Sequence, residues 1–217
     1  MAANAALPEP AGVGPGRRYR GLSAPDRRAD QRRRIVRAAT QEFAARGFEH
    51  TSVEDVVRSA RTSRTAFYAF FDNREDAMYG AVQAALRELL DEVRRSVDAC
   101  PVDGDPASVG VASFVEWLVA RPAEARIILV EGVGISPEVN AMRSRMRREM
   151  AFMICNSWTR RDESAAETPA AETIAVGVFG MLFESMVDLV ASNRLEEAPY
   201  RVPVLVEAIK KVLARDG

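Results

Sequence analysis

The chain has 217 residues, 47% of them hydrophobic and 28% charged, with a net charge of −1. This composition predicts a globular protein, and the two cysteines, Cys100 and Cys155, form no CxxC pair, which argues against a disulfide scaffold or a zinc site. Residues 1–75 carry 14 arginines against nine acidic groups, whereas residues 76–217 have a net charge of −6. Such asymmetry is typical of a small nucleic-acid-binding module on a larger domain, the alternative being an uneven surface without functional meaning.

Neither a membrane span nor a secretory signal is expected. The longest apolar stretches, ILVEGVGI and TIAVGVFGMLFESMVDLVA, are interrupted by Glu131, Glu184 or Asp188. The first residues, MAANAALPEPAGVGPG, lack a charged start followed by an apolar run. We therefore expect a cytoplasmic protein.

Residues 1–22 are rich in alanine, proline and glycine and then become basic, so a disordered arm is predicted. Order is expected from Ser23, where Ser-Ala-Pro-Asp has the pattern of a helix N-cap. Apolar residues at four-residue spacing then predict a first helix over 23–46, which ends at Gly47.

Two short helices follow. Thr51 and Ser52 precede acidic residues in a second N-cap pattern, and the helix that they begin ends near Ala60. A hydroxyl residue recurs at Ser63, so a third helix is predicted to about Ala69 after a tight turn. Two short helices joined in this way predict a helix-turn-helix.

The remainder also reads as helical. A long amphipathic helix is predicted from Asn73 to just before Pro101. Further helices are predicted over 106–120, 123–133, 138–161, 169–192 and 202–215, with Pro122, Pro137, Pro169 and Pro203 near their starts. No stretch alternates as a strand would, so the fold class is all-α. We expect three parts: the arm (1–22), a helix-turn-helix domain (23–75) and a larger helical effector-binding and dimerisation domain (76–217).

The third helix, within SRTAFYAFFDNRED, has the residue types that read DNA. Phe67 and Phe71, four residues apart, are expected to face inward. The arginine of the opposite face can bind guanine bidentately, and hydroxyl groups can bind base edges or phosphates. The residues expected to contact DNA are Thr51, Ser52, Ser63, Arg64, Thr65, Tyr68 and Arg74, the last as a phosphate clamp. Arginines 17, 18 and 20 of the arm could enter a minor groove or simply add non-specific charge.

The run RIVRAATQEFAARGFEHTSVEDVVRSARTSRTAFYAFFDNRED resembles the DNA-binding region of the TetR/AcrR family of bacterial regulators. The residues in register with the family pattern are Ala38, Ala39, Phe43, Gly47, Phe48, Thr51, Ser52, Val53, Ala60, Ser63, Tyr68, Phe71 and Glu75. Three positions depart from it: Arg61 replaces a usual glycine, Phe70 a common histidine and Arg74 a usual lysine.

This resemblance implies a homodimer that binds double-stranded DNA, most often as a repressor, and leaves it when a small molecule enters the larger domain. A two-fold dimer would read a palindromic operator with half-sites about 34 Å apart or more.

Met142, Met146, Met150 and Met153 form a methionine stripe on the predicted helix 138–161. Such a stripe suits an adaptable apolar cavity, although an ordinary core face is the alternative reading for each residue. The residues expected to line the cavity are Phe114, Trp117, Met142, Met146, Met150, Phe179 and Phe183. Glu184 and Asp188 lie in an apolar helix and need arginines across a dimer interface, solvent or a cationic ligand. The helix of Gly177 and Gly180 and the last helix are expected to form the dimer contact.

Catalysis is not expected, because His50 is the single histidine and the sequence has no phosphate-binding glycine loop or nucleophile elbow. No metal or cofactor is predicted. The remaining alternative is a protein-interaction adaptor that keeps the fold without reading DNA, which the departures at Arg61 and Phe70 would favour.

Overall fold

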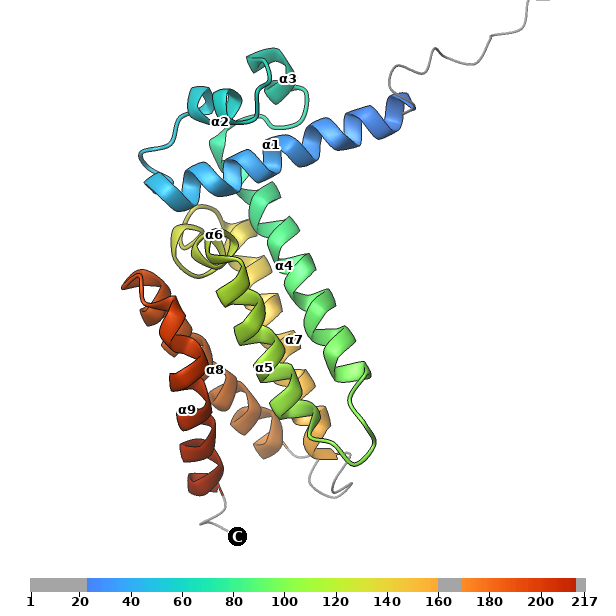
Figure 1. Ribbon diagram of the computed structural model, residues 1–217, viewed down its shortest axis with the longest axis vertical. Coiled ribbons are helices and arrows are strands. Elements are labelled where there is room, and N and C mark those ends of the chain that lie inside the picture. The colour runs from blue at the N-terminus through green and yellow to red at the C-terminus, as the bar shows by residue number, and fades with distance from the viewer. Residues whose placement is uncertain (1–22, 160–168, 214–217) are drawn as a thin grey trace, which may run out of the picture.

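The structure, a computed structural model, describes residues 23–159 and 169–213 as a set of helices without a strand in these ranges (Figure 1). The all-α prediction is thus confirmed, while the N-terminal arm lies outside the described residues. The α-helices are α1 (Ala24–Arg46), α2 (Val53–Ser59), α3 (Arg64–Tyr68), α4 (Arg74–Asp98), α5 (Pro106–Ala120), α6 (Pro122–Arg126), α7 (Pro137–Thr159), α8 (Pro169–Ala191) and α9 (Ala198–Leu213). A π-helical segment, Ile127–Glu131, called here the π turn, follows α6, and a short 3₁₀ turn, Leu195–Glu197, precedes α9.

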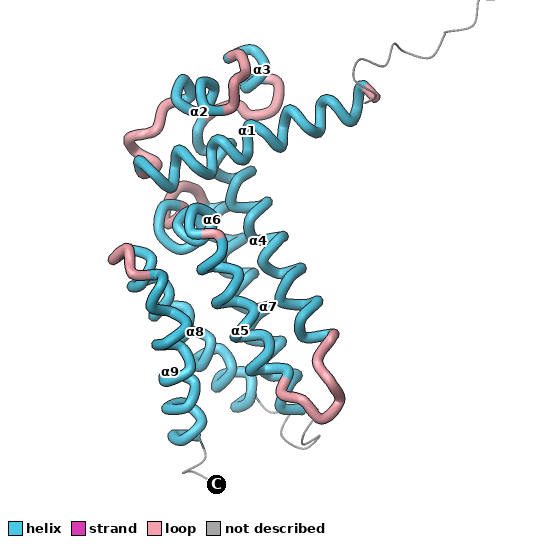
Figure 2. Tube along the Cα trace, viewed as in Figure 1, coloured by secondary structure: helices cyan, strands magenta, loops and turns pink. Residues whose placement is uncertain are grey.

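The helices form two connected regions. Helix α1 crosses one end of the molecule with α2 and α3 on its outer side, and α4 runs from that end along α5 and α7 (Figure 2). Helices α8 and α9 pack together beside α5 and α7, and α6 and the π turn lie next to α1. The elements that can meet DNA are therefore at one end, and α4 connects them with the body.

Side-chain caps fix where the first four helices begin. Ser23, Ser52, Ser63 and Asn73 each accept a hydrogen bond from the backbone N–H three residues later. At the start of α2 the cap is reciprocal, since Ser52 donates its own N–H and its hydroxyl to Asp55. These bonds to Ser52, with a further one from Arg46, hold the pKa of the Asp55 carboxyl well below its ordinary range. The caps predicted from the sequence at Ser23, Ser52 and Ser63 are thus present.

Two boundaries differ from the sequence-based expectation. The segment expected to be one helix over 123–133 is α6 followed by the π turn. The last helix begins at Ala198, so Pro203 lies inside it and not near its start. Proline in a helix interior leaves the carbonyl four residues earlier without an N–H partner. Here that residue is Pro199, which is exposed, as is Pro203, so water can satisfy the carbonyl.

One continuous apolar core joins the two regions. It includes Phe43 and Phe67 in the N-terminal helices and Leu118, Met146 and Met186 in the body, all almost fully buried. Part of α8, Thr173–Ala191, is long and apolar enough to cross a membrane by length and composition, and 39% of its most apolar window is buried in the protein. In this fold α8 packs against α7, α9 and the π turn.

Candidate nucleic-acid interface and apolar cavity

The turn between α2 and α3 has the left-handed geometry that usually calls for glycine. Arg61 has φ of 49°, and the turn is closed by hydrogen bonds from Arg61 N to Arg58 O (3.1 Å) and from Thr62 N to Val57 O (3.1 Å). A side chain in this region costs roughly 1–2 kcal/mol relative to the right-handed conformation. The helix-turn-helix therefore keeps its turn in spite of the arginine.

The inner side of α3 and of the turn after it consists of phenyl rings. Phe67 is fully buried and Phe71 is 3% exposed. Both belong to the same core cluster as Phe43 and Val56, as predicted, and their ring centroids are 5.7 Å apart. Burial of a ring of this size contributes about 1.5–3 kcal/mol, which is enough to fix how a five-residue helix is rotated about its axis.

The rotation of α3 exposes its polar face. Ser63, Arg64, Thr65 and Tyr68 are all exposed, and Tyr68 retains 47% of its surface. The Ser63 hydroxyl oxygen accepts from the N–H of Ala66, so its proton remains available for an external acceptor. The structure thus brings these four predicted residues together on one outward surface, called here the α3 face.

Arg64 on the α3 face has a partner on the neighbouring helix. Its Nη1 lies 2.7 Å from Oε1 of Glu54, and both side chains are largely exposed. An exposed ion pair of this kind contributes about 0–1 kcal/mol, so it orients the guanidinium but is easily exchanged for another acceptor.

The hydroxyl groups of Thr51 and Ser52 are engaged within the protein. Thr51 is buried, and its Oγ1 donates to Gly47 O at 2.8 Å, with Glu42 O at 3.2 Å. Ser52 donates its hydroxyl to Asp55 at 2.6 Å. The Thr51 hydroxyl thus closes the loop after α1 and the Ser52 hydroxyl caps α2, while the expected contact of these two residues with DNA stays a prediction.

Arg74 makes contacts within the protein through one guanidinium nitrogen, and its expected role as a phosphate clamp stays a prediction. Its Nη1 donates to the carbonyls of Thr51 (3.0 Å) and Phe48 (3.2 Å), and Glu49 O lies at 3.4 Å. The guanidinium sits 4.6 Å from the centre of the Phe48 ring. Through these Nη1 contacts and the ring, Arg74 fixes the α1–α2 loop to the start of α4.

Two arginines of α1 contact the end of the helix-turn-helix. Neither was singled out from the sequence. Arg28 lies 5.1 Å from the Phe70 ring centre and donates to Ala69 O at 3.3 Å. Arg32 lies 5.3 Å from the Phe71 ring centre. The partners are about 40 positions apart, so no local spacing rule could have found them.

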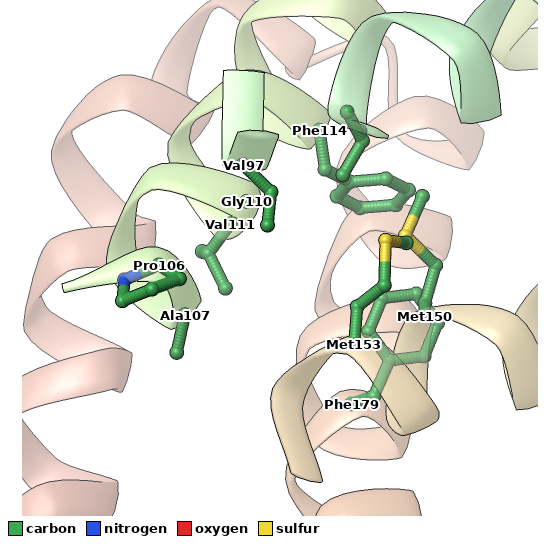
Figure 3. Close-up of a pocket in the computed structure, with 10 residues that line it drawn as sticks. Val97, Pro106, Ala107, Gly110, Val111, Phe114, Met150, Met153 and Phe179 are labelled. Carbon is green, nitrogen blue, oxygen red and sulfur yellow. The ribbon is translucent and has the colours of Figure 1, made fainter. Parts of the chain in front are cut away.

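An apolar cavity lies among α4, α5, α7 and α8 (Figure 3). Its lining residues are Val93, Val97, Pro106, Ala107, Gly110, Val111, Phe114, Met150, Met153 and Phe179. Its volume is about 20 Å³. A site of this size holds about one water, whereas pockets for drug-sized ligands measure roughly 300–1,000 Å³.

The sequence located this cavity in part. Phe114, Met150 and Phe179 line it, and Met153 of the same methionine stripe joins them. The other expected residues lie elsewhere: Met146, Trp117 and Phe183 are buried in the core, and Met142 is half-buried against it. Arg147 lies over the Phe183 ring and Arg121 over the Trp117 ring.

The outer faces of α8 and α9 form an apolar surface. Its exposed apolar residues are Ile174, Val176, Met181, Tyr200 and Val204. Nothing lies within 4 Å of a Cβ built on Gly177 or Gly180. Glu184 and Asp188 are exposed on the groove between α8 and α9, so in this chain water solvates them and no internal partner is needed.

The fold and the α3 face define a helix-turn-helix protein with a larger helical domain. Residues 35–77 match the sequence profile of the bacterial regulatory proteins of the tetR family. This match agrees with the resemblance found over the same segment.

Two curated relatives are similar over somewhat more than half of the chain. One is an uncharacterised HTH-type transcriptional regulator of Haemophilus influenzae, 30% identical over 127 residues, which are 57% of this chain and 59% of that protein. The other is the uncharacterised HTH-type transcriptional regulator YdgC of Bacillus subtilis, 35% identical over 129 residues, covering 58% and 62%. The chain thus spans about three-fifths of the length of these relatives.

Solved structures share most of the fold at lower identity. The fatty acid degradation regulator FadR of Bacillus halodurans has a TM-score of 0.66 and 18% identity, covering 84% of this chain and 94% of that one. FadR of Bacillus subtilis in complex with stearoyl-CoA has a TM-score of 0.66 and 13% identity, covering 80% and 97%. These likenesses show the two-domain α-helical fold.

We expect Arg61→Gly to stabilise the protein by about 1 kcal/mol, because glycine adopts positive φ without steric cost. Urea unfolding followed by circular dichroism measures the change. Arg58→Gly, on the neighbouring helix, is the matched control and should destabilise by about 1 kcal/mol. Equal destabilisation by both substitutions would contradict the left-handed turn.

Proposed function

We propose that the protein is a DNA-binding transcriptional repressor that binds a palindromic operator as a homodimer and is released by a small apolar ligand. The observation that carries this proposal is the rotation of α3, with Phe67 and Phe71 buried and Ser63, Arg64, Thr65 and Tyr68 exposed together. In a helix-turn-helix the second helix enters the major groove with such a face toward the bases. A cytoplasmic location follows from this function.

The four exposed residues divide the work of recognition. Arg64 can bind the O6 and N7 of a guanine bidentately, and Thr65 can meet a base edge or a thymine methyl. The hydroxyls of Ser63 and Tyr68 can bind phosphate oxygens and set the register. Thr51, Ser52 and Arg74 serve this surface indirectly, since they fix the loop and helix on which α3 rests.

One α3 face is too small to discriminate an operator alone, so a dimer is required. The exposed apolar faces of α8 and α9 support a two-fold contact that pairs these helices with their copies. Patches of this kind on a monomer mark interaction sites. The contact lies in the body, away from α3, which leaves both α3 faces free to reach successive half-sites.

The cavity is the candidate ligand site, and α4 is the element that links it to α3. Val93 and Val97 of α4 line the cavity, and the same helix begins at Arg74, which holds the α1–α2 loop. A ligand must enlarge a space of about 20 Å³, so it displaces the lining helices. Displacing α4 changes the position of α3 relative to its copy in the dimer.

The lining residues carry no charged or hydroxyl side chain, which favours an uncharged apolar ligand or the apolar part of a larger one. The B. subtilis FadR structure, which shares the fold, holds stearoyl-CoA. That protein shows that this fold accommodates a long acyl compound. For this chain the likeness supports the proposal of an apolar ligand and does not identify it.

Arg64→Ala is expected to weaken sequence-specific binding by about 1–3 kcal/mol, because a bidentate base contact is lost. The test measures binding to the intergenic DNA flanking the gene at two salt concentrations, against a scrambled fragment of equal length. Arg87→Ala, an exposed arginine in the middle of α4, is the control and should leave the affinity unchanged. An adaptor protein that does not read DNA would show no preference for either fragment, with or without Arg64.

Val204→Glu is expected to convert the dimer into a monomer at micromolar concentration, because it places a charge on the apolar face of α9, where Val204 is 70% exposed. Analytical ultracentrifugation measures the state. Val133→Glu alters a side chain that is 56% exposed outside this surface and should remain dimeric. A wild-type protein that sediments as a monomer would refute the dimer and the palindromic operator together.

Ala107→Leu is expected to abolish ligand binding by filling the cavity while DNA binding persists. A thermal-shift screen of apolar metabolites and drugs identifies compounds that raise the Tm of the wild type, and these compounds are then tested on the variant. Ala112→Leu, exposed on the same helix, should respond as the wild type does. Equal responses in the two variants would place the ligand site elsewhere.

A further inference from the structure

The peptide units of Phe48, in the loop between α1 and α2, are held from two sides. The Phe48 N–H donates to Oε2 of Glu131 at 3.2 Å, and the Phe48 carbonyl accepts from Arg74 at 3.2 Å. The first contact comes from the π turn in the body and the second from α4. The loop that precedes the helix-turn-helix is therefore tied to the body by a second connection besides α4.

Glu131 is itself fixed by hydrogen bonds. Its other oxygen, Oε1, accepts from Nε of Arg126 at 3.1 Å, and Nη1 of Arg126 donates to Asn193 at 3.2 Å, just after α8. Only 14% of the Glu131 side chain and 29% of the Arg126 side chain are exposed. The carboxylate thus connects α6 and the end of α8 with the loop after α1.

The π turn leaves two carbonyls without helical partners. The N–H of Gly132 bonds to Ile127 O at 2.9 Å, and the N–H of Val133 bonds to Val130 O at 3.2 Å. In an α-helical register these two N–H groups would instead satisfy the carbonyls of Ile128 and Leu129. Those carbonyls must find another donor, because buried carbonyls are almost always paired.

Arg143 of α7 is that donor. Its Nε lies 2.6 Å from Ile128 O, and Nη2 lies 3.4 Å from Leu129 O. Arg143 is 7% exposed and forms no ion pair with a carboxylate of the described residues. Burial and the neighbouring Arg147 lower the pKa of Arg143. A buried cation without a counter-ion is costly, so its bonds to these carbonyls explain its presence and favour the π register over the α register.

Gly132 makes the same register possible. A Cβ at this position would lie 2.6 Å from Ile127 O, closer than a real Cβ approaches a backbone oxygen. The glycine and the arginine therefore act together: one allows the i+5 bond to close, and the other satisfies the carbonyls that the closure leaves. The result places Glu131, the last residue of the π turn, against Phe48.

The helix that carries Arg143 also forms a wall of the cavity. Met150 lies two turns after Arg143 on α7, and Met153 follows it (Figure 3). Because a ligand larger than one water must push the lining helices apart, its binding moves α7 relative to the π turn. A displacement along α7 is transmitted to the Arg143 bonds.

We propose that Glu131 is a positioning residue for the helix-turn-helix, presented to Phe48 by a π turn that Arg143 stabilises. Loss of the Arg143 bonds returns the segment toward an α-helical register, which rotates Glu131 away and frees the loop after α1. The regulatory half of this inference, in which the ligand acts through α7, rests on the proposed function; the positioning of Phe48 does not.

Hydrogen exchange of the Phe48 amide, followed by NMR on the full chain, tests the positioning without DNA or ligand. Glu131→Ala should exchange this amide at least tenfold faster than the wild type, while the amide of Leu89 in the core of α4 is unchanged. Glu124→Ala, on the adjoining helix α6, is the matched control and should leave Phe48 at the wild-type rate. An unchanged Phe48 rate in Glu131→Ala overturns the proposal.

Arg143→Met supplies the second variant, since it replaces a buried cation by an apolar chain of comparable length and is expected to fold. This variant should accelerate exchange of the Phe48 amide as Glu131→Ala does, although Arg143 does not touch Phe48. Arg145→Met, which alters an exposed arginine of the same helix, is the control and should leave the Phe48 rate unchanged. A slow Phe48 amide in Arg143→Met overturns the role given to the π turn.

Measurements of DNA binding separate the two proposals. Glu131→Ala should bind the intergenic fragment about tenfold more weakly than the wild type, while the further loss from Arg64→Ala stays the same. Wild-type protein that shows no sequence preference refutes the proposed function but leaves the exchange result standing. Fast Phe48 exchange with undiminished DNA affinity overturns the claim that this contact positions the helix-turn-helix.

Discussion

The burial of Phe67 and Phe71 is the constraint from which the proposed recognition surface follows. Helix α3 has only five residues, too few to be stable alone, so packing and not helix propensity decides its orientation. Because both rings lie in the core shared with Phe43, the side chains of the α3 face point outward. The guanidinium and hydroxyl groups of the α3 face are thus exposed because the phenyl rings on the opposite side are buried.

Arginines around this unit perform several different tasks. Arg64 is exposed and loosely oriented by Glu54, which suits a group that must exchange one acceptor for another. Arg74 and Arg28 instead donate to backbone carbonyls and lie over aromatic rings, so they hold parts of the protein together. Arg143 does the same for the π turn inside the body. A count of arginines in the sequence suggests a cationic surface, but several of these guanidinium groups bind carbonyls or rings within the protein.

Besides the packing of α6 and the π turn against α1, two elements of the body reach the loop that leads into α2. Helix α4 is continuous from the cavity wall to Arg74, and the π turn reaches the loop after α1 through Glu131. Both meet at Phe48, whose carbonyl and N–H they bind from different sides. Because Phe48 directly precedes the segment that leads into α2, a change in either connection alters how α2 and α3 sit on α1.

Sequence alone determined most of the helices, the first caps and the face of α3, because these depend on residues within a turn or two of one another. Ser63 before a helix and rings four apart are local facts. It did not determine which polar groups remain available: Thr51 and Arg74 are engaged by carbonyls that the chain brings near only when the loop after α1 folds back. Likewise, the methionine stripe indicated a cavity wall, but only the packing of α5, α7 and α8 decided that Met150 and Met153 face it while Met146 does not. Contacts between distant segments depend on how helices cross, and no spacing rule within one helix contains that information.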